Sequence, residues 1–440
     1  MSVIIFLLTG TLSALLPELT SLNERMIREK DITLPYGVIP LFGEEDGIRL
    51  SLYSTVDTVK YTQLSPIIQY KKNGWGFNFA PLLRMGFAHI YPTRKKFGVY
   101  ADFIRGSIFY KNDNLILSSG KDIFSIGGSF EHNPVLSPNL PLNYARFIYI
   151  GDNFSFLQLI ARLDDYEGVE NIWAGGYSSD TALFQRYLGI HRLEFKPTKR
   201  IGISFSEVML IGGESGGFPF ELLSPLTIYY AEQFNKDRNV NILWNIDAKV
   251  IFNNFLFYLD FFIDDFQYEE DLWKEPNHIG IYAGIQGVDL IKEGSRLLLS
   301  YNLMTRWCYC NLRVWQRYTD GEFPLGSPLG NDYDRFYLQA LYPLSSFYAG
   351  LEFSFTRRGE NKIDTPWPVN TDSDPTPDNQ FSGTNFLSGT IEKRQSISSI
   401  IRYKSLFTLK AGFYHIQNYR HQDGITKTEP LLQLEINYHL

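Results

Sequence analysis

Two carboxylate pairs are the residues whose types and spacing could do chemistry. Asp164 and Asp165 follow one apolar run, and Asp264 and Asp265 follow another. Two carboxylates at a suitable separation can act as general acid and base on a glycosidic bond. The sequence fixes no such separation, and solvated strand ends above an aromatic belt explain the pattern more simply. We therefore expect no catalytic residue, and keep Asp165, Asp264 and Asp265 as candidates for contact with a glycan.

A polar, aromatic-rich excursion, residues 212–239, holds further candidates. It contains Glu214, Tyr229 and Tyr230. Aromatic rings stack on the apolar faces of sugars, and carboxylates bind sugar hydroxyl groups. We predict that these three residues contact a glycan. The excursion would also suit a loop that folds into the mouth of a barrel as a plug, and the two interpretations are compatible.

Charged residues share one side of two alternating runs. Arg186, Arg192 and Glu194 lie on one side of the first run, and Asp247 and Lys249 lie on the polar side of another. Charges that face the inside of a barrel usually pair across its wall. We expect structural pairing here, and keep Arg186 as a further candidate for glycan contact.

Metal and enzyme signatures are weak or missing. His191 falls on the opposite face from Arg192, where a lone histidine seldom makes a metal site. Cys308 and Cys310 stand two apart on a predicted strand, so we expect two small apolar fillers on one face. The sequence has no GxSxG, no HExxH and no phosphate loop. We expect no enzyme, no cofactor and no bound metal.

The elements that must position these residues alternate with a period of two. Ile242, Trp244 and Ile246 fall on one face of their run, while Asn245 and Asp247 fall on the other. Such alternation predicts a strand with one apolar and one polar face. About eighteen runs of this kind follow one another, an even number, as in bacterial outer-membrane barrels. We predict strands near residues 48–57, 61–71, 74–89, 98–111, 114–127, 143–150, 153–165, 184–196, 200–211, 238–250, 254–266, 276–288, 295–308, 333–342, 347–358, 390–403, 405–416 and 430–440.

The connections between these runs alternate in length. With the C-terminus in the periplasm, the short turns face the periplasm and the long connections face outward, which is typical of outer-membrane barrels. The predicted outer connections are 129–142, 166–183, 212–237, 309–332, 359–386 and 417–429. A run of 295–318 that split into two strands would break this parity.

Composition and the N-terminal residues agree with an exported membrane protein. Aromatic residues are 16% of the 440, as barrels with aromatic girdles require, and a net charge of -7 argues against nucleic acid as a partner. Residues 1–16 resemble the apolar part of a secretory signal. Residues 17–47 form a periplasmic segment with an amphipathic helix that ends near Pro35, and residues 48–440 form the barrel.

A resemblance to a known family rests on the central block. The segments RYLGIHRLEFKP, IGISFSEVMLIGGE, LLSPLTIYYAEQF, NILWNIDAKV and YLDFFIDDF, together with GKDIFSIGGS, NLPLNYARF and GEFPLGSPLGNDYDRFYLQALYPL, resemble the capsule assembly protein Wzi family. The resemblance implies an outer-membrane barrel of 18 strands with a pore closed by loops. It also implies a lectin-like role in holding capsular polysaccharide at the cell surface.

We therefore predict an all-β transmembrane antiparallel barrel in the outer membrane of a Gram-negative bacterium. It would have a short N-terminal periplasmic helix and loops folded into its mouth. We expect it to bind and anchor capsular or extracellular polysaccharide as a monomer, with outer-membrane lipid, lipopolysaccharide and the barrel assembly machinery as its other partners. A porin-like channel for small solutes is the first alternative. An outer-membrane hydrolase is the second, and it would need a carboxylate pair or a Ser/His pair within hydrogen-bonding reach at the rim.

Overall fold

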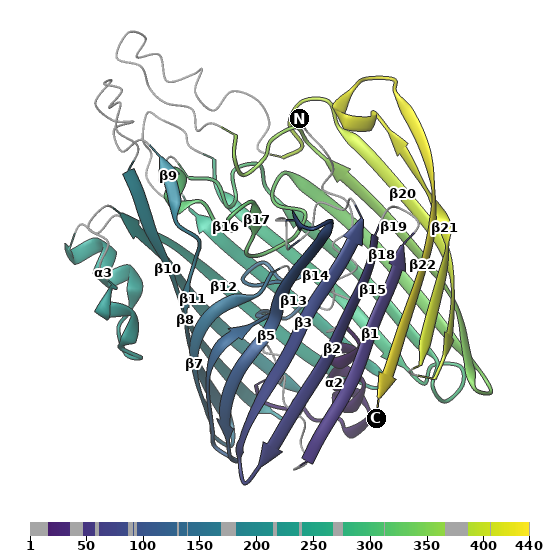
Figure 1. The fold of residues 1–440 in the computed structure, drawn as a ribbon, viewed down its shortest axis with the longest axis horizontal. Helices are drawn as coiled ribbons and strands as arrows, with labels where there is room; N and C mark the ends of the chain where they lie inside the picture. Colours follow the sequence, from purple (N-terminus) through teal and green to yellow (C-terminus); the bar gives the residue numbers. More distant parts are fainter. Residues whose placement is uncertain are drawn as a thin grey trace.

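The structure is a computed structural model, and it shows one closed antiparallel β-barrel (Figure 1). It describes residues 16–35, 47–57, 61–86, 91, 95–129, 132–138, 140–168, 182–213, 218–236, 240–266, 276–311, 313–365, 386–404 and 406–439. The first strand pairs with the last, with Ser51 opposite His439 and Asp57 opposite Gln433. This pairing closes the ring and leaves no free sheet edge, as a spanning sheet in lipid requires.

Eighteen long strands make up the ring within the described residues, which confirms the predicted number. They are β1 (Gly47–Asp57), β2 (Tyr61–Lys72), β3 (Trp75–Gly86), β5 (Val99–Lys111), β6 (Leu115–Asp122), β7 (Leu142–Ile150), β8 (Phe154–Arg162), β10 (Ala182–Thr198), β11 (Ile201–Gly213), β12 (Val240–Phe252), β13 (Phe255–Asp265), β14 (His278–Val288), β15 (Arg296–Met304), β18 (Tyr333–Leu344), β19 (Phe347–Arg358), β20 (Glu392–Tyr403), β21 (Phe407–Gln417) and β22 (Thr426–His439).

The loops between the long strands contain several short elements. They are the strands β4 (Lys95–Lys96), β9 (Tyr166–Gly168), β16 (Thr319–Asp320) and β17 (Phe323–Pro324), and the 3-10 turns η1 (Phe220–Leu223), η2 (Val314–Gln316) and η4 (Tyr419–His421). Two α-helices are described, α2 (Leu16–Glu29) and α3 (Tyr229–Lys236). No helix in the described part of the chain is both long and apolar enough to cross a membrane.

The strands alternate between lumen and lipid as the sequence pattern predicts. On β12, Asn245, Asp247 and Lys249 are buried in the lumen, whereas Ile246 and Val250 are exposed on the outer wall. Tight turns join the strands at one end. Asn253, between β12 and β13, has a φ of +51°, a left-handed conformation that asparagine tolerates better than most residues. Because barrels have short periplasmic turns, we assign this end to the periplasm.

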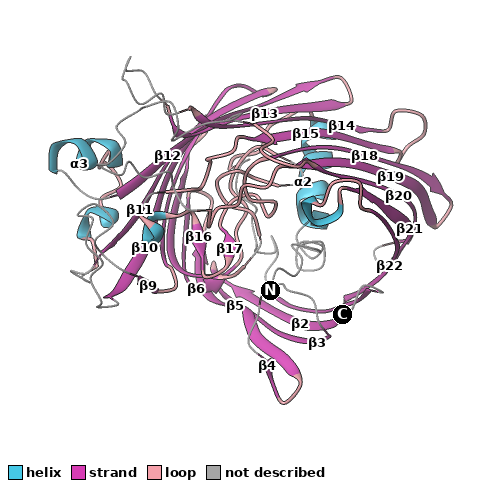
Figure 2. Cartoon of the chain, turned by 90° about the horizontal axis from the view of Figure 1, so that it is seen from above, coloured by secondary structure: helices cyan, strands magenta, loops and turns pink. Residues whose placement is uncertain are grey.

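The helix α2 lies inside the barrel (Figure 2) and toward the end that carries the periplasmic turns (Figure 1). Its buried face carries Met26 and Ile27, as the predicted amphipathic pattern requires. Glu24 pairs with Arg296 on β15 at 2.8 Å, and Arg28 pairs with Asp289 at 3.0 Å. The helix is therefore fixed to the wall by ion pairs around an apolar contact.

Two sequence expectations are wrong. Cys308 and Cys310 do not lie on a strand, because β15 ends at Met304 and both cysteines sit in the buried loop that follows. The excursion between β11 and β12 does not fold into the mouth over its described residues 218–236. There, η1 and α3 lie against the outside of the barrel, beside β10 and β11 (Figures 1 and 2).

Candidate functional site

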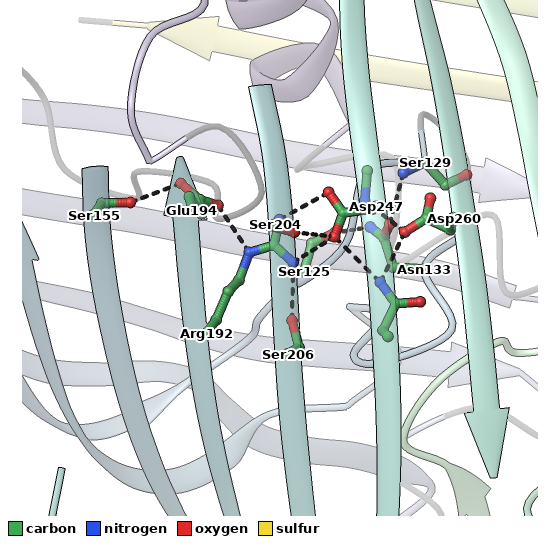
Figure 3. A network of polar contacts seen from close by, with 12 residues as sticks. Ser125, Ser129, Asn133, Ser155, Arg192, Glu194, Ser204, Ser206, Asp247 and Asp260 are labelled. Carbon is green, nitrogen blue, oxygen red and sulfur yellow. Dashed lines mark hydrogen bonds and ion pairs between the residues drawn. The ribbon is translucent and has the colours of Figure 1, made fainter. Parts of the chain in front are cut away.

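A buried charge network on the lumenal wall holds the loop that enters the barrel after β6 (Figure 3). The guanidinium of Arg192 donates two hydrogen bonds to Asp247, at 2.6 and 3.0 Å, and one to Glu194 at 2.8 Å. Ser155 donates to the second oxygen of Glu194 at 2.8 Å. Arg192 and Asp247 pair across β11, in agreement with the expectation that lumen-facing charges of these strands pair structurally.

The network reaches the loop through Asp260. Asn245 bridges the two carboxylates, donating to Asp247 at 3.2 Å and to Asp260 at 3.1 Å. Asp260 in turn accepts a hydrogen bond of 2.9 Å from the backbone N–H of Gly128 (Figure 3). A Cβ at Gly128 would lie 3.1 Å from Asp260 and 3.3 Å from Asp247, so glycine lets the loop approach the wall this closely.

A second loop, between β15 and β18, is fixed by Arg186. This side chain is almost fully buried and donates to the carbonyl oxygens of Trp315 (2.7 Å), Arg317 (2.7 Å) and Thr319 (2.8 Å). The ring of Phe184 stacks on that of Trp315 with centroids 4.2 Å apart. One cation on the wall thus donates to three carbonyl groups of the loop, of which that of Arg317 also accepts the N–H of Thr319.

The two loops bind each other through tyrosine hydroxyl groups. Tyr309 donates to the carbonyl of Pro134 at 2.6 Å, and Tyr318 donates to that of Val135 at 2.7 Å. The two rings stack with centroids 5.3 Å apart, and burial raises the pKa of both phenols. We call the described residues 123–129, 132–138, 305–311 and 313–332 the plug.

The plug fills one side of the lumen. Apolar plug residues such as Phe124 and Leu325 join one buried cluster with Leu188, Leu210 and Phe262 of the wall. Seen from above, loops crowd the interior of the ring (Figure 2). Among the residues that the structure describes, this part of the barrel is therefore packed like a protein core.

The wall from β18 to β21 is lined differently. Lys410 pairs with Glu352, which also accepts a hydrogen bond of 2.9 Å from Tyr337. Arg394 pairs with Glu392 at 3.3 Å. All four side chains of these two pairs keep some solvent exposure, so this side of the lumen is polar and partly hydrated.

Asp332 fixes the start of β18 to the next outer loop. Its carboxylate accepts hydrogen bonds from the N–H and hydroxyl of Ser388 (3.2 and 2.5 Å) and from the N–H of Asn361 (3.2 Å). Asn361 donates to the carbonyl of Arg306 in the plug at 2.7 Å. Three outer segments thus meet at one buried carboxylate.

The predicted glycan contacts fall in three different places. Asp165 lies at the outer end of β8, partly exposed and paired with Arg162. Asp265 is exposed at the outer end of β13. Asp264, beside it, accepts a hydrogen bond from the backbone N–H of Tyr309 and so supports the plug.

The remaining candidates do not gather with these carboxylates. Arg186 is buried beneath the plug, where its donors are taken by carbonyl groups. Tyr229 is fully buried and Tyr230 partly exposed on the outer wall. Glu214 lies outside the described residues. The structure therefore does not bring the predicted residues into one site, and it places only Asp165 and Asp265 at the open rim.

Sequence reasoning missed Asp320 on the plug. Its carboxylate accepts a hydrogen bond of 2.5 Å from the backbone N–H of Asp164, the other member of the first carboxylate pair. Burial raises the pKa of Asp320 to about 6, although the Asp164 N–H and the charge of Arg186 lower it. The segment GEFPLGSPLGNDYDRF begins directly after Asp320. Because this segment carries part of the family resemblance, it was the one feature of the sequence that could have pointed to Asp320.

No group of three or more His, Cys, Asp or Glu side chains that could hold a metal occurs among the residues that the structure describes. The described chemistry is instead that of hydrogen bonds and ion pairs. The rim offers carboxylates and a guanidinium, Arg162, next to solvent. Such groups can bind hydroxyl-rich ligands reversibly.

Comparisons with known proteins agree with this architecture. The sequence profile of a family described as capsule assembly protein Wzi matches residues 141–424. Among solved structures, Wzi, an outer membrane protein involved in group 1 capsule assembly in Escherichia coli and described as a carbohydrate binding β-barrel, matches at 12% identity with a TM-score of 0.59. The match covers 95% of this chain and 87% of that chain.

A second similar structure is OprD from Pseudomonas aeruginosa, at 9% identity with a TM-score of 0.46, covering 89% of this chain and 94% of that chain. No curated protein matches the chain significantly. The solved structure of Wzi, at 12% identity, supports the fold, and the profile supports the family.

Proposed function

The chain belongs to the capsule assembly protein Wzi family, and on this premise we propose that it binds capsular or extracellular polysaccharide and anchors it at the cell surface. The observation that carries the proposal is the plug. Arg186 and the Asp247 network fix two loops inside the barrel, and an apolar cluster seals them to the wall. A barrel filled in this way is suited to holding a ligand at its outer face.

We place the contact with polysaccharide at the outer rim. Asp165 and Asp265 stand at strand ends on the extracellular side and keep solvent exposure. Arg162, paired with Asp165, adds a donor beside that acceptor. Carboxylates and guanidinium groups are suited to sugar hydroxyl and carboxyl groups. We propose binding without hydrolysis.

We also propose that the chain acts as a monomer among outer-membrane lipid and lipopolysaccharide, and that the barrel assembly machinery inserts it. The porin-like alternative would need a wide continuous lumen. The packed side of the lumen argues against a channel, whereas the polar wall at β18–β21 is the feature that favours one.

The experiment measures polysaccharide retained on cells that carry Asp165→Asn, Asp265→Asn or both. We expect the double variant to retain several-fold less polysaccharide than the wild type at equal barrel yield. Asp113→Asn is the matched control, since Asp113 is an exposed aspartate in a turn at the opposite end of the barrel. Retention by the double variant equal to that of the control would remove both rim residues from the site.

Single-channel conductance of the refolded protein separates the anchor from the porin. We expect inserted wild-type protein to be silent or nearly so. A steady, large and weakly selective conductance would contradict the anchor and support the channel.

A further inference from the structure

Four side chains with polar groups form a row across the outer wall of the barrel. On β10, His191 lies opposite Gln158 of β8 and opposite Glu207 of β11. Glu207 in turn lies opposite Trp244 of β12. We call these four residues the polar row. It runs across four neighbouring strands along the direction of their hydrogen bonds.

The polar row faces away from the lumen. Its neighbours along the strands on the same face, Leu193, Phe205 and Ile246, are about half exposed on the outer wall. The residues next to it on the other face, such as Arg192, belong to the lumenal charge network. A carboxylate and an imidazole on the lipid side of a barrel wall would be costly if nothing paired with them.

The excursion between β11 and β12 supplies hydrogen bonds to the row. Gln158 donates to the carbonyl of Leu222 at 2.6 Å. Glu207 accepts the backbone N–H groups of Tyr229 at 2.8 Å and Tyr230 at 2.9 Å, which are the first two of α3. These amides have no partner within a helix, so the wall carboxylate and the helix end satisfy each other.

Aromatic rings cover the rest of the row. The ring of Tyr229 stacks on His191 with centroids 4.1 Å apart, and the ring of Tyr230 lies 5.1 Å from that of Trp244. Gly189 makes this approach possible, because a Cβ there would lie 2.8 Å from the hydroxyl of Tyr229. The inner face of the excursion therefore matches the row residue by residue.

The outer face of the same excursion is apolar. Leu226 is 90% exposed and Phe234 is 79% exposed, and Phe220 and Ile228 are also largely exposed. In water such a group of large apolar side chains would be unfavourable. Phe205 of β11, on the outer wall, is exposed as well.

The height of the row places this surface beside lipid. Six residues separate Glu207 from Ile201 at the periplasmic end of β11. At about 3.3 Å per residue and a strand tilt of about 40°, Glu207 stands roughly 15 Å above that end. The apolar band of an outer-membrane barrel is about 25 Å tall, so the row falls within it.

We propose that residues 218–236 form a membrane-contacting buttress. Its inner face seals the polar row from lipid, and its outer face contacts the acyl chains of the outer leaflet. This surface is independent of the polysaccharide site, so it goes beyond the proposed function. It also explains why an aromatic-rich segment with Tyr229 lies outside the mouth.

The test is the depth of spin labels in nanodiscs of dimyristoyl phosphatidylcholine. Cysteines replace Leu226 and Phe234 in a Cys308→Ser/Cys310→Ser background and carry a nitroxide. We expect molecular oxygen to relax both labels more than a water-soluble nickel chelate does, as at a wall reference, Phe205→Cys. A label at Asp423→Cys in an exposed outer turn should show the reverse. Labels at 226 and 234 that behave like the one at 423 would overturn the proposal.

A pair of glycine variants tests the inner face. Gly189→Val should displace the excursion and at least double the mobility of the label at 226, because its side chain would clash with Tyr229. Gly106→Val is the matched control on the outer wall, where a Cβ meets nothing within 4 Å. Heat-modifiable gel migration checks that both barrels form. Equal mobility of the label in folded Gly189→Val and Gly106→Val proteins would contradict the sealing role.

Discussion

The guanidinium of Arg186, on the barrel wall, donates a hydrogen bond of 2.7 Å to the carbonyl oxygen of Trp315, which lies 129 residues further along the chain. Two further carbonyl groups of the same loop, those of Arg317 and Thr319, accept from this side chain. One wall residue thus holds three backbone groups of the plug loop between β15 and β18. Because the acceptors are backbone carbonyl oxygens, changing the side chains of the loop does not remove them, and the test must be made at Arg186.

We expect Arg186→Met to release the plug. Each hydrogen bond from a charged group is worth about 1.5–3 kcal/mol, and three carbonyl groups of the loop would lose such a donor. The variant should conduct ions in planar bilayers where the wild type is silent. Arg186→Lys should lie between the two, because lysine keeps the charge but cannot reproduce the planar fork.

The two cysteines provide an independent readout of the same change. Cys308 and Cys310 are the only cysteines, both are buried, and burial raises the pKa of both thiols. A maleimide should therefore label the wild type slowly and Arg186→Met quickly. Slow labelling together with silence in Arg186→Met would show that this side chain does not hold the plug.

The buried ion pair between Arg192 and Asp247 should matter far more for stability than the exposed pair between Arg162 and Asp165. Removing one partner of a buried pair costs about 3–5 kcal/mol, because the other charge stays buried without compensation. An exposed pair contributes about 0–1 kcal/mol. Arg192→Met should lower the temperature at which the barrel loses its heat-modifiable migration, and Arg162→Met should leave it nearly unchanged.

A double variant tests whether the charges of Arg192 and Asp247 act as a pair. Arg192→Met combined with Asp247→Asn should regain part of the lost stability, because it removes the uncompensated carboxylate charge. If the double variant is as unstable as the sum of the two single variants, the charges do not act as a pair.

The sequence was sufficient to predict the strands, their faces and that the lumen-facing charges pair structurally, although not which charge pairs with which. These follow from a period of two and from the rule that charges in a barrel wall face the lumen. His191 shows where such reasoning stops. It falls on the lipid face of an otherwise regular strand, and only the register with β11 reveals that Glu207 lies beside it.

The contacts that hold the plug could not be read from residue types. Arg186 binds carbonyl groups, which every residue carries, so no motif marks the partner positions. Asp320 lies on the loop between β15 and β18, and it is buried where this loop meets Asp164, which is far from it in the sequence. Periodicity describes a strand and its two faces, but it contains no information on where a long irregular loop comes to rest.

The plug should hold less firmly as the pH rises through the titration of Asp320. Burial raises the pKa of this carboxyl from the ordinary 3.8 to about 6, and the nearby groups are Asp164, Arg186 and Lys121. In a released plug the carboxyl would titrate near its ordinary value. Between these values the bound plug holds an extra proton, so its stability is greatest below about pH 4 and falls until about pH 6. The difference corresponds to roughly 3 kcal/mol.

Asp320→Asn should abolish this dependence. The amide oxygen can still accept the N–H of Asp164, but no charge is buried when the pH rises. Maleimide reacts with the thiolate, so its labelling rate rises with pH whether or not the plug moves. The measurement is therefore the open probability of single channels at pH 4.5, 6 and 7.5. We expect the rare, brief openings of the wild type and of an Asp423→Asn control to become more frequent with pH without reaching the steady conductance of a porin, and to stay equally rare at every pH in Asp320→Asn. A wild-type protein whose openings do not change over this range would show that Asp320 is not the group that weakens the plug.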